Sequence, residues 1–262
     1  MRGRRAPLFP QKGAHIPASY PSIKDLSDEE RVRLVRRIFN AVTGRYDFLN
    51  HFLSAGRDRM WRKFLVRRLR FFSTYRLLDL ATGTGDIALA AARTHGKIQV
   101  LALDFAWSML LAADRKRRKS NLINRIALVQ GDAFRLPFPD ETFDAVSIGF
   151  GIRNMPNRLR VYEEILRVLV PGGRLHLLEL TTPQGRIFRT LYLGYLKHLL
   201  PRLARWFTPD PPAYLYLAES ILHFPTPKEL VREMEQAGFV QVVHFPLTFG
   251  ITCLHEGSRP KR

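Results

Sequence analysis

Short apolar runs alternate with stretches of helical periodicity through the middle of the chain. The apolar runs cover residues 76–81, 98–103, 126–129, 143–148 and 174–180. Between them, apolar side chains recur at helical spacing over residues 87–94, 107–118 and 158–169. Buried apolar strands that alternate with helices are typical of βαβ units. The pattern therefore predicts an α/β fold built on a mostly parallel sheet.

Helical patterns flank and interrupt this alternation. Ser27 and Glu30 have the spacing of a capping box at the start of an amphipathic helix. A second amphipathic stretch, residues 58–69, alternates Arg and Lys with Trp, Phe and Leu. Residues 183–224 break the alternation with an aromatic, Pro-containing segment, which we interpret as a helical insertion over the sheet. A helix over 226–237 and two last strands, near 239–245 and 248–255, complete the predicted order.

The pattern predicts one domain with a tail. Residues 1–26 contain four prolines among basic and small residues, which favours a disordered basic tail. Residues 27–262 are then a single domain, with helices over 27–75 before the sheet and the insertion on the substrate side. Pro171, Gly172 and Gly173 are expected to form the turn between one helix and the next strand.

Net charge is the unusual feature of the composition. The 262 residues carry 42 Lys and Arg against 23 Asp and Glu, a net charge of +19. Residues 1–78 alone hold 18 basic and 6 acidic side chains, which is +12 of that excess. A basic face of this size suits nucleic acid or an anionic membrane surface, although an Arg-rich composition that serves only solubility explains it equally well.

Other composition features narrow the class of protein. The one cysteine, Cys253, excludes internal disulfides and Cys-rich metal sites, and we expect no metal. The most apolar window, 98–113, is broken by polar residues and is shorter than a membrane span. No apolar run follows the basic N-terminus as it would in an export signal. We therefore expect a cytoplasmic protein, associated peripherally with the inner face of the membrane at most.

A glycine-rich turn follows the first predicted strand. In residues 79–86, Gly83, Thr84 and Gly85 lie between Asp79 and Asp86. Glycines let a ligand approach the backbone closely, and the helix that follows offers unpaired N–H groups. A dinucleotide site would have a third glycine where Ala88 stands, and the acids would repel a pyrophosphate. A positively charged sulfonium ligand suits this loop better.

Acidic residues also follow the next two strands. Asp104 ends the second strand, where a carboxylate can accept from both ribose hydroxyls of an adenosine. Asp132 and Ala133 follow the third strand, where a carboxylate can accept from the adenine amino group. Any of these acids alone could be a cap or turn residue, but their shared position at strand ends favours a nucleoside site.

These residues resemble a class I S-adenosylmethionine-dependent methyltransferase. Further segments resemble, over about residues 31–256, the C-methyltransferases of menaquinone and ubiquinone biosynthesis. They are residues 39–50 with the Arg45-Tyr46-Asp47 motif, residues 136–144, the Phe150-Gly151-Ile152-Arg153-Asn154 segment, and residues 214–221 with Tyr214 and Tyr216. The resemblance implies a Rossmann-like fold with a seven-stranded, mostly parallel sheet, an antiparallel final strand and S-adenosylmethionine as the methyl donor.

The resemblance also implies roles for individual residues. Cofactor binding is expected from Asp79, Gly83, Thr84, Gly85, Asp104, Asp132, Ala133 and Gly149, although the family usually has Ser where Gly149 stands. Arg153, Asn154 and Tyr46 are the expected catalytic residues. Because guanidinium stays protonated in proteins, Arg153 is expected to stabilise a phenolate or position a water instead of acting as a base. Asp47, Tyr214, Tyr216 and His223 are expected on the substrate side, with His223 as a candidate base.

The implied reaction is C-methylation of a prenylated demethylmenaquinol. A methoxy-polyprenyl-benzoquinol of ubiquinone biosynthesis is the alternative substrate. An RNA methyltransferase is a competing class because of the charge, but no Asn-Pro-Pro-aromatic motif follows the fourth strand, so we expect no nucleic-acid partner. The expected partners are the prenylated quinol and an anionic membrane surface. The sequence leaves open whether the chain forms a homodimer.

Overall fold

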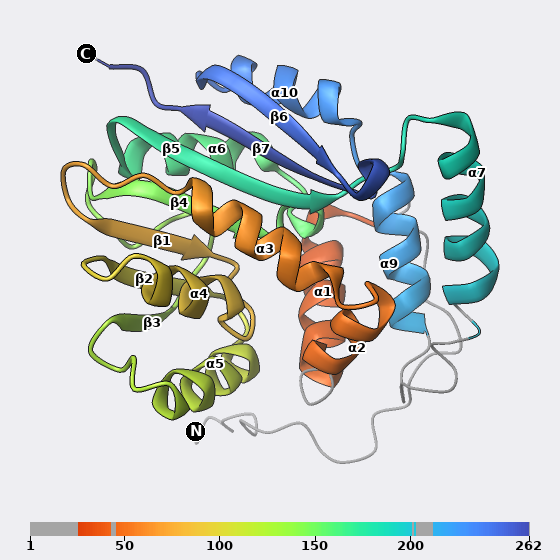
Figure 1. The fold of residues 1–262 in the computed structure, drawn as a ribbon, viewed down its shortest axis with the longest axis horizontal. Helices are drawn as coiled ribbons and strands as arrows, with labels where there is room; N and C mark the ends of the chain where they lie inside the picture. Colours follow the sequence, from red (N-terminus) through yellow and green to blue (C-terminus); the bar gives the residue numbers. More distant parts are fainter. Residues whose placement is uncertain (1–25, 43–45, 201, 203–211, 262) are drawn as a thin grey trace, which may run out of the picture.

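The computed structural model describes residues 26–42, 46–200, 202 and 212–261. The tail predicted for residues 1–26 lies, apart from Leu26, outside these described residues. Within them, the chain forms a central sheet covered by helices on both faces, with further helices across the carboxyl end of the sheet (Figure 1).

The sheet has seven strands in the order β3-β2-β1-β4-β5-β7-β6. Five neighbouring strands pair in parallel, and β7 pairs antiparallel with both β5 and β6. This topology confirms the predicted fold class, including the single reversed final strand. The strands are β1 (Arg76–Leu80), β2 (Gln99–Asp104), β3 (Ile126–Gln130), β4 (Phe143–Gly149), β5 (Leu169–Leu180), β6 (Val240–Leu247) and β7 (Thr252–Ser258).

Neighbouring strand residues bury their side chains on opposite faces of the sheet. Leu78 packs with helices α6 (Arg158–Val168) and α10 (Pro227–Gln236). Its neighbour Leu77 packs with α3 (Arg57–Arg68) and α4 (Asp86–Thr94) on the other face. Since both faces are covered, the parallel strands read as continuous apolar runs in the sequence.

Helices from two distant parts of the chain pack together over the carboxyl ends of the strands. Leu34, Val35 and Ile38 share one buried cluster with Tyr192, Leu196, Tyr216 and Ile221. The N-terminal helices are α1 (Asp28–Val42) and α2 (Tyr46–Leu53), and the insertion contains α7 (Arg186–Gly194), the π-helical turn η4 (Tyr195–Leu199) and α9 (Pro212–Leu222). Figure 1 shows α7 at the edge of the molecule, beside α9. The insertion is therefore helical in its described part, as predicted.

Helix ends follow their sequence signals. The Ser27 backbone N–H donates to Glu30 Oε2 at 2.9 Å, and the Glu30 N–H donates to Ser27 Oγ at 3.3 Å, so the predicted capping box is present. Thr226 and Glu229 form a second capping box at α10. Helix α5 (Trp107–Lys119) matches the helix predicted over 107–118.

Two predicted boundaries are wrong. Pro171, Gly172 and Gly173 do not separate a helix from a strand, because β5 already begins at Leu169 and these residues interrupt its pairing register with β4. The last strand begins at Thr252 and not at Thr248, because residues 248–250 form the short 3-10 turn η5. Both errors come from backbone turns with positive φ, at Gly172 (78°) and at Thr248 (48°), which hydrophobic periodicity does not detect.

In the described part of the chain, none of the helices combines the length and the apolar character needed to cross a bilayer.

Candidate functional site

The turn after β1 is held from beneath by Asp79. The Asp79 carboxylate is buried and accepts from Thr82 Oγ at 2.6 Å and from Ser147 Oγ at 2.7 Å. Burial raises its pKa to about 6, because desolvation outweighs the hydrogen bonds that favour the charged form. Asp79 thus supports the glycine loop from inside the protein. It does not line the large cavity that is described below.

Glycine is required in this loop by backbone geometry. Gly83 and Gly85 have φ angles of 56° and 83°, in the left-handed region. A Cβ atom on Gly85 would also lie 3.1 Å from Ala113 Cβ, because α5 packs directly behind the turn. Any other residue at position 85 would strain the backbone and push α5 away.

Asp104, at the end of β2, turns a buried carboxylate toward this loop. Its two oxygens accept from the backbone N–H groups of Gly83 and Ala106, each at 2.8 Å. Burial raises the pKa of Asp104, and these N–H donors act in the opposite direction. A carboxylate has about four acceptor positions, so Asp104 retains capacity to accept from the hydroxyls of a bound ribose.

A cavity of about 890 Å³ opens at the carboxyl ends of β1, β2, β3 and β4. Its lining includes Gly83, Asp104, Asp132 and Ala133, together with several residues of the N-terminal helix α1. The exposed Asp132 side chain accepts from the Phe134 N–H at 2.9 Å, which leaves further acceptor positions. The volume and these acceptors fit an adenosine-bearing cofactor such as S-adenosylmethionine.

Gly149 forms part of the wall of this large cavity. A Cβ atom at this position would lie 2.3 Å from Ile87 Cδ1. A serine here, as is usual in the resembled family, would therefore require Ile87 to move. In this chain the backbone of Gly149 forms the wall, which is compatible with the predicted contact between Gly149 and the cofactor.

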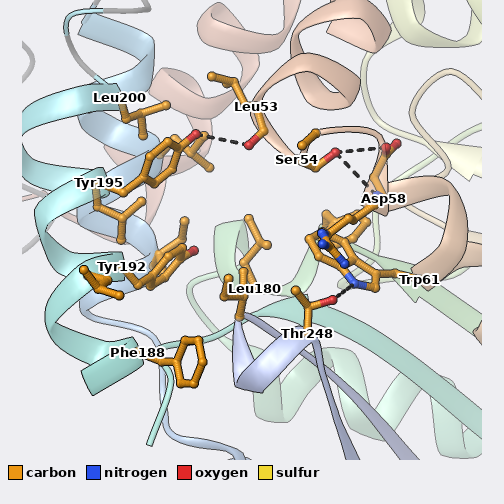
Figure 2. A pocket seen from close by; sticks show the side chains of 18 of the residues that line it. Leu53, Ser54, Asp58, Trp61, Leu180, Phe188, Tyr192, Tyr195, Leu200 and Thr248 are labelled. Carbon is orange, nitrogen blue, oxygen red and sulfur yellow. Dashed lines mark hydrogen bonds between the residues drawn. The ribbon is translucent and has the colours of Figure 1, made fainter. Parts of the chain in front are cut away.

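A second, smaller cavity of about 380 Å³ lies between the insertion and α3 (Figure 2). Tyr192 and Tyr195 line one side, and Trp61 lies opposite them. Tyr195 Oη donates to the Leu53 carbonyl at 3.1 Å, and Trp61 Nε1 donates to Thr248 Oγ at 2.8 Å. Because most of its remaining lining is Leu, Ile and aromatic carbon, the small cavity suits an apolar ligand.

Residues 150–154 separate the two cavities. Phe150 borders both, Arg153 borders the small cavity, and Asn154 borders the large one. Phe150 has a φ of 60°, which is uncommon for a bulky residue and indicates that its neighbours hold it in place. The predicted motif therefore lies where a ligand of each cavity would meet.

Arg153 is a buried cation with a buried partner. Its guanidinium forms an ion pair with Glu179, at the end of β5, and donates to the Phe150 carbonyl at 2.7 Å. The Arg153 carbonyl in turn accepts from Arg31 of α1 at 2.6 Å. Next to it, Asn154 Oδ1 accepts from Tyr216 Oη at 3.3 Å. These bonds join the motif to β5, α1 and α9.

Asp47 and Thr84 meet outside the small cavity. Thr84 Oγ donates to Asp47 Oδ1 at 2.6 Å, and Lys116 of α5 lies 2.7 Å from the other Asp47 oxygen. Lys116 also pairs with Asp86 at 2.5 Å. Asp47 thus ties α2 to the glycine loop. It borders neither the large nor the small cavity, although the resemblance implies a substrate role for it.

The remaining predicted residues are not all brought together. His223 is exposed, with its ring Nδ1 2.9 Å from the Glu219 carbonyl, and it borders neither cavity. The side chains of Tyr46 and Tyr214 lie outside the described residues. Their backbones belong to α2 and α9.

Sequence reasoning misses several residues of the site. Glu179 is the next-to-last residue of β5. An acidic residue at the end of an apolar strand is the pattern that marks Asp79 and Asp104, and the same pattern marks Glu179. The sequence marks Trp61 only as part of a basic amphipathic stretch. Lys116 has no sequence signal, because its partners come from α2 and α4.

Comparison with known proteins finds related sequences over most of the chain. Residues 24–259 match the ubiE/COQ5 methyltransferase family. A ubiquinone/menaquinone biosynthesis C-methyltransferase from Geobacter sulfurreducens is 40% identical over 231 residues, which cover 88% of this chain and 90% of the relative. The protein of that name from Pseudomonas entomophila is 36% identical over 253 residues, covering 96% and 99%.

Solved structures show the same fold at low identity. A Haemonchus contortus phosphoethanolamine N-methyltransferase 2, bound to phosphomonomethylethanolamine and S-adenosylhomocysteine, superposes with a TM-score of 0.64 at 15% identity. It covers 91% of this chain and 61% of that one. An S-adenosylmethionine-dependent methyltransferase from Aquifex aeolicus gives a TM-score of 0.53 at 18% identity, covering 75% and 88%.

Proposed function

The chain belongs to the ubiE/COQ5 methyltransferase family, and we propose that it methylates a ring carbon of prenylated demethylmenaquinol. It is an S-adenosylmethionine-dependent C-methyltransferase. The relatives named above act in quinone biosynthesis, so the RNA methyltransferase alternative is not favoured. A methoxy-polyprenyl-benzoquinol is the second candidate, since the names of those relatives include ubiquinone as well as menaquinone.

One observation carries the proposal. A large cavity with polar strand ends adjoins a small apolar cavity, and Phe150, Arg153 and Asn154 form the boundary. Two ligands of different chemistry would meet there, one a nucleoside and the other an apolar ring. Methyl transfer needs this kind of alignment between donor and acceptor.

The cofactor would be held by residues around the large cavity. Asp104 would accept from the ribose hydroxyls, Asp132 from the adenine amino group, and the N–H groups of the glycine loop would position the amino-acid part. Bound there, S-adenosylmethionine supplies an electrophilic methyl group. Asp79 and Thr84 would act indirectly, because they fix the loop and its link to α2.

The boundary residues would activate the quinol ring. A ring carbon becomes nucleophilic when a neighbouring hydroxyl loses its proton, since phenolate charge delocalises onto the ring. Arg153 remains protonated and would stabilise that charge, while Glu179 and the Phe150 carbonyl hold its guanidinium in position. Asn154 would complete the polar end of the pocket, and the catalytic role proposed for Tyr46 rests on the family resemblance alone.

The small cavity would hold the apolar part of the substrate. Tyr192, Tyr195 and Leu196 would contact the ring or the first prenyl units. A long prenyl chain resides in the bilayer, so the enzyme must reach the membrane surface to collect it. We therefore include peripheral association with the inner face of the membrane in the proposal, favoured by the net charge of +19.

A methyl-transfer assay tests the proposed substrate. Purified enzyme would receive radiolabelled S-adenosylmethionine with reduced demethylmenaquinol, with a methoxy-benzoquinol or with total RNA. We expect label in the naphthoquinol, less in the benzoquinol and none in RNA. Label in RNA alone would overturn the proposal, and equal transfer to both quinols would widen the substrate class.

A further inference from the structure

Helix α7 exposes large apolar side chains to solvent. Ile187 is 75% exposed, Leu191 65% and Phe188 43%. Such side chains gathered on one short helix form an interaction surface, whereas single exposed apolar residues do not. The opposite side of the insertion is buried, because Tyr192 and Leu196 pack against α1 and α9.

A strained turn adds one more aromatic side chain to this surface. Phe249, in the η5 turn between β6 and β7, is 68% exposed and has a left-handed backbone, with a φ of 56°. Its ring stacks on Phe188, with centroids 4.2 Å apart and planes 6° apart. Bulky residues occupy this backbone region at a cost. Folding alone would favour Asn or Gly here, so an exposed phenylalanine indicates a role at the surface.

The exposed side chains surround the entrance of the small cavity. Phe188 and Leu191 line that cavity and are also exposed, so the cavity reaches solvent beside α7. Figure 2 shows Phe188 at one edge of the cavity, on the same helix as Tyr192. A ligand that enters beside α7 therefore passes over apolar carbon.

Exposed cations lie beside this entrance. Residues 180–209 contain no Asp or Glu, and α7 carries Arg186 and Arg189, both exposed. Arg57, at the start of α3, is exposed and lines the same cavity. Asp58 also lines this cavity, but its carboxylate is buried and pairs with Arg62. Exposed apolar side chains next to exposed cations are the composition of segments that rest at an anionic lipid surface.

We propose that Ile187, Phe188, Leu191 and Phe249, the apolar rim, insert into the interfacial region of an anionic bilayer and so open the small cavity directly to the lipid. Arg57, Arg186 and Arg189 then lie at the level of the lipid phosphates. The proposal rests on the proposed function, because a prenylated quinol could pass from the bilayer into the cavity without crossing water.

Helix α3 is less suited to this task despite its charge. Of its large apolar residues, Trp61 and Leu65 are buried, 3% and 0% exposed, and cannot insert, whereas Met60 is 50% exposed. Arg68, one of its basic residues, pairs with Glu256 of β7 at 2.5 Å. The exposed cations of α3 can add long-range attraction, whereas the apolar rim supplies both attraction and insertion.

Fluorescence of a labelled cysteine tests insertion directly. Cys253, the native cysteine, is buried, and burial raises the pKa of its thiol to about 12, so it should resist labelling. Ile187→Cys and the control Leu159→Cys, at an exposed position on α6, would each carry an environment-sensitive fluorophore. With phosphatidylglycerol-containing vesicles we expect a blue shift at position 187 and none at 159. No shift at 187 would overturn the proposal.

Substitution of the rim tests its consequence for turnover. Ile187→Gln with Phe249→Asn removes apolar surface at positions that do not line either cavity, and Asn is tolerated at positive φ. We expect vesicle binding to fall at least about tenfold, with an equal loss of turnover on long-chain quinol in vesicles. Turnover on a tailless, water-soluble quinol should not change, and Leu159→Gln should change neither.

Other outcomes separate this inference from the proposed function. Full vesicle binding by the double variant, or a wild-type dimer that the double variant converts to monomers in solution, would overturn membrane insertion and leave quinol methylation intact. Absence of methyl transfer to every quinol, with vesicle binding unchanged, would instead overturn the proposed function.

Discussion

The two cavities differ in how the chain builds them. The large cavity is formed mainly at the ends of neighbouring parallel strands, where Gly83, Asp104 and Asp132 each follow or end a strand. The small cavity is formed by side chains from α2, α3, η5 and the insertion, which are distant in sequence. The proposed cofactor site therefore depends on sheet topology, whereas the proposed substrate site depends on how helices pack over the sheet.

The difference has a functional consequence. Ligands commonly bind at the carboxyl ends of parallel strands, so a cofactor site of this kind can be kept while the covering helices change. The helices then decide which substrate is accepted. Substitutions in one cavity should accordingly change one ligand and spare the other, except at the boundary.

The largest effect is expected at that boundary. Arg153→Met should lower turnover at least about a hundredfold, because a charge that stabilises the phenolate is lost, and should leave S-adenosylmethionine affinity nearly unchanged. It should also destabilise the fold by about 3–5 kcal/mol, because Glu179 is left buried without its cation. Urea unfolding, calorimetric binding and the methyl-transfer assay measure these effects.

A second substitution separates the two roles of Arg153. In the double variant Arg153→Met with Glu179→Gln, no unpaired carboxylate remains, so much of the stability should return while turnover stays low. If turnover also returned, Arg153 would serve only to neutralise Glu179, and the boundary would lack its proposed chemistry.

The next effect concerns Asp79, the buried carboxylate that supports the glycine loop beside the large cavity. The pKa of Asp79 is raised from 3.8 to about 6, so the folded state holds this proton more tightly than the unfolded state. This preferential protonation stabilises the folded state. Its contribution to the free energy of unfolding is fully present below the unfolded pKa, about pH 4, and is lost as pH rises through 6. Over this window it amounts to roughly 3 kcal/mol.

The variant Asp79→Asn tests this dependence. The difference in free energy of unfolding, wild type minus Asp79→Asn, should fall by roughly 2 kcal/mol, most of that amount, between pH 4 and pH 6 in the absence of cofactor. Urea unfolding at several pH values measures it. A pH-independent difference would show that hydrogen bonds from Thr82 and Ser147 keep Asp79 charged in this range.

Loss of the ribose acceptor should affect only the cofactor. Asp104→Ala should weaken S-adenosylmethionine binding roughly ten- to a hundredfold, since hydrogen bonds to charged groups contribute about 1.5–3 kcal/mol. Calorimetry measures the affinity, and the KM for the quinol should change little at saturating cofactor. Unchanged cofactor binding would contradict the assignment of the large cavity.

The smallest effect is expected in the small cavity. Leu196→Ala should raise the KM for long-chain quinol by roughly tenfold, because apolar contact area is lost, and should leave cofactor affinity unchanged. Met109→Ala, in the lining of the large cavity, is the matched control and should show the reverse pattern. If both variants changed both ligands equally, the two cavities would not act as separate sites.

The sequence by itself determined the α/β order and the sheet edge that we propose as the cofactor side of the site. Hydrophobic periodicity is a local property, so the runs at 76–81 and 98–103 predict β1 and β2 to within a residue or two at each end. Because parallel strands align their carboxyl ends, the order of strands and acids along the chain is enough to assign positions 79, 104 and 132 to one edge of the sheet.

Only the tertiary structure decided which residues form the proposed substrate side. Arg153 and Glu179 are 26 positions apart, Asp47 and Thr84 are 37 apart, and Trp61 and Thr248 are 187 apart. No local pattern encodes such pairs, because each depends on the packing of whole helices against the sheet. Likewise, the basic amphipathic stretch of residues 58–69 has the composition of a segment that rests at an anionic surface. Folding nevertheless buries Trp61 and Leu65 of α3 and leaves Ile187 and Leu191 of α7 exposed. Both segments mix cations with large apolar side chains, and only the neighbours that cover an apolar side chain decide whether it belongs to the core or to the surface.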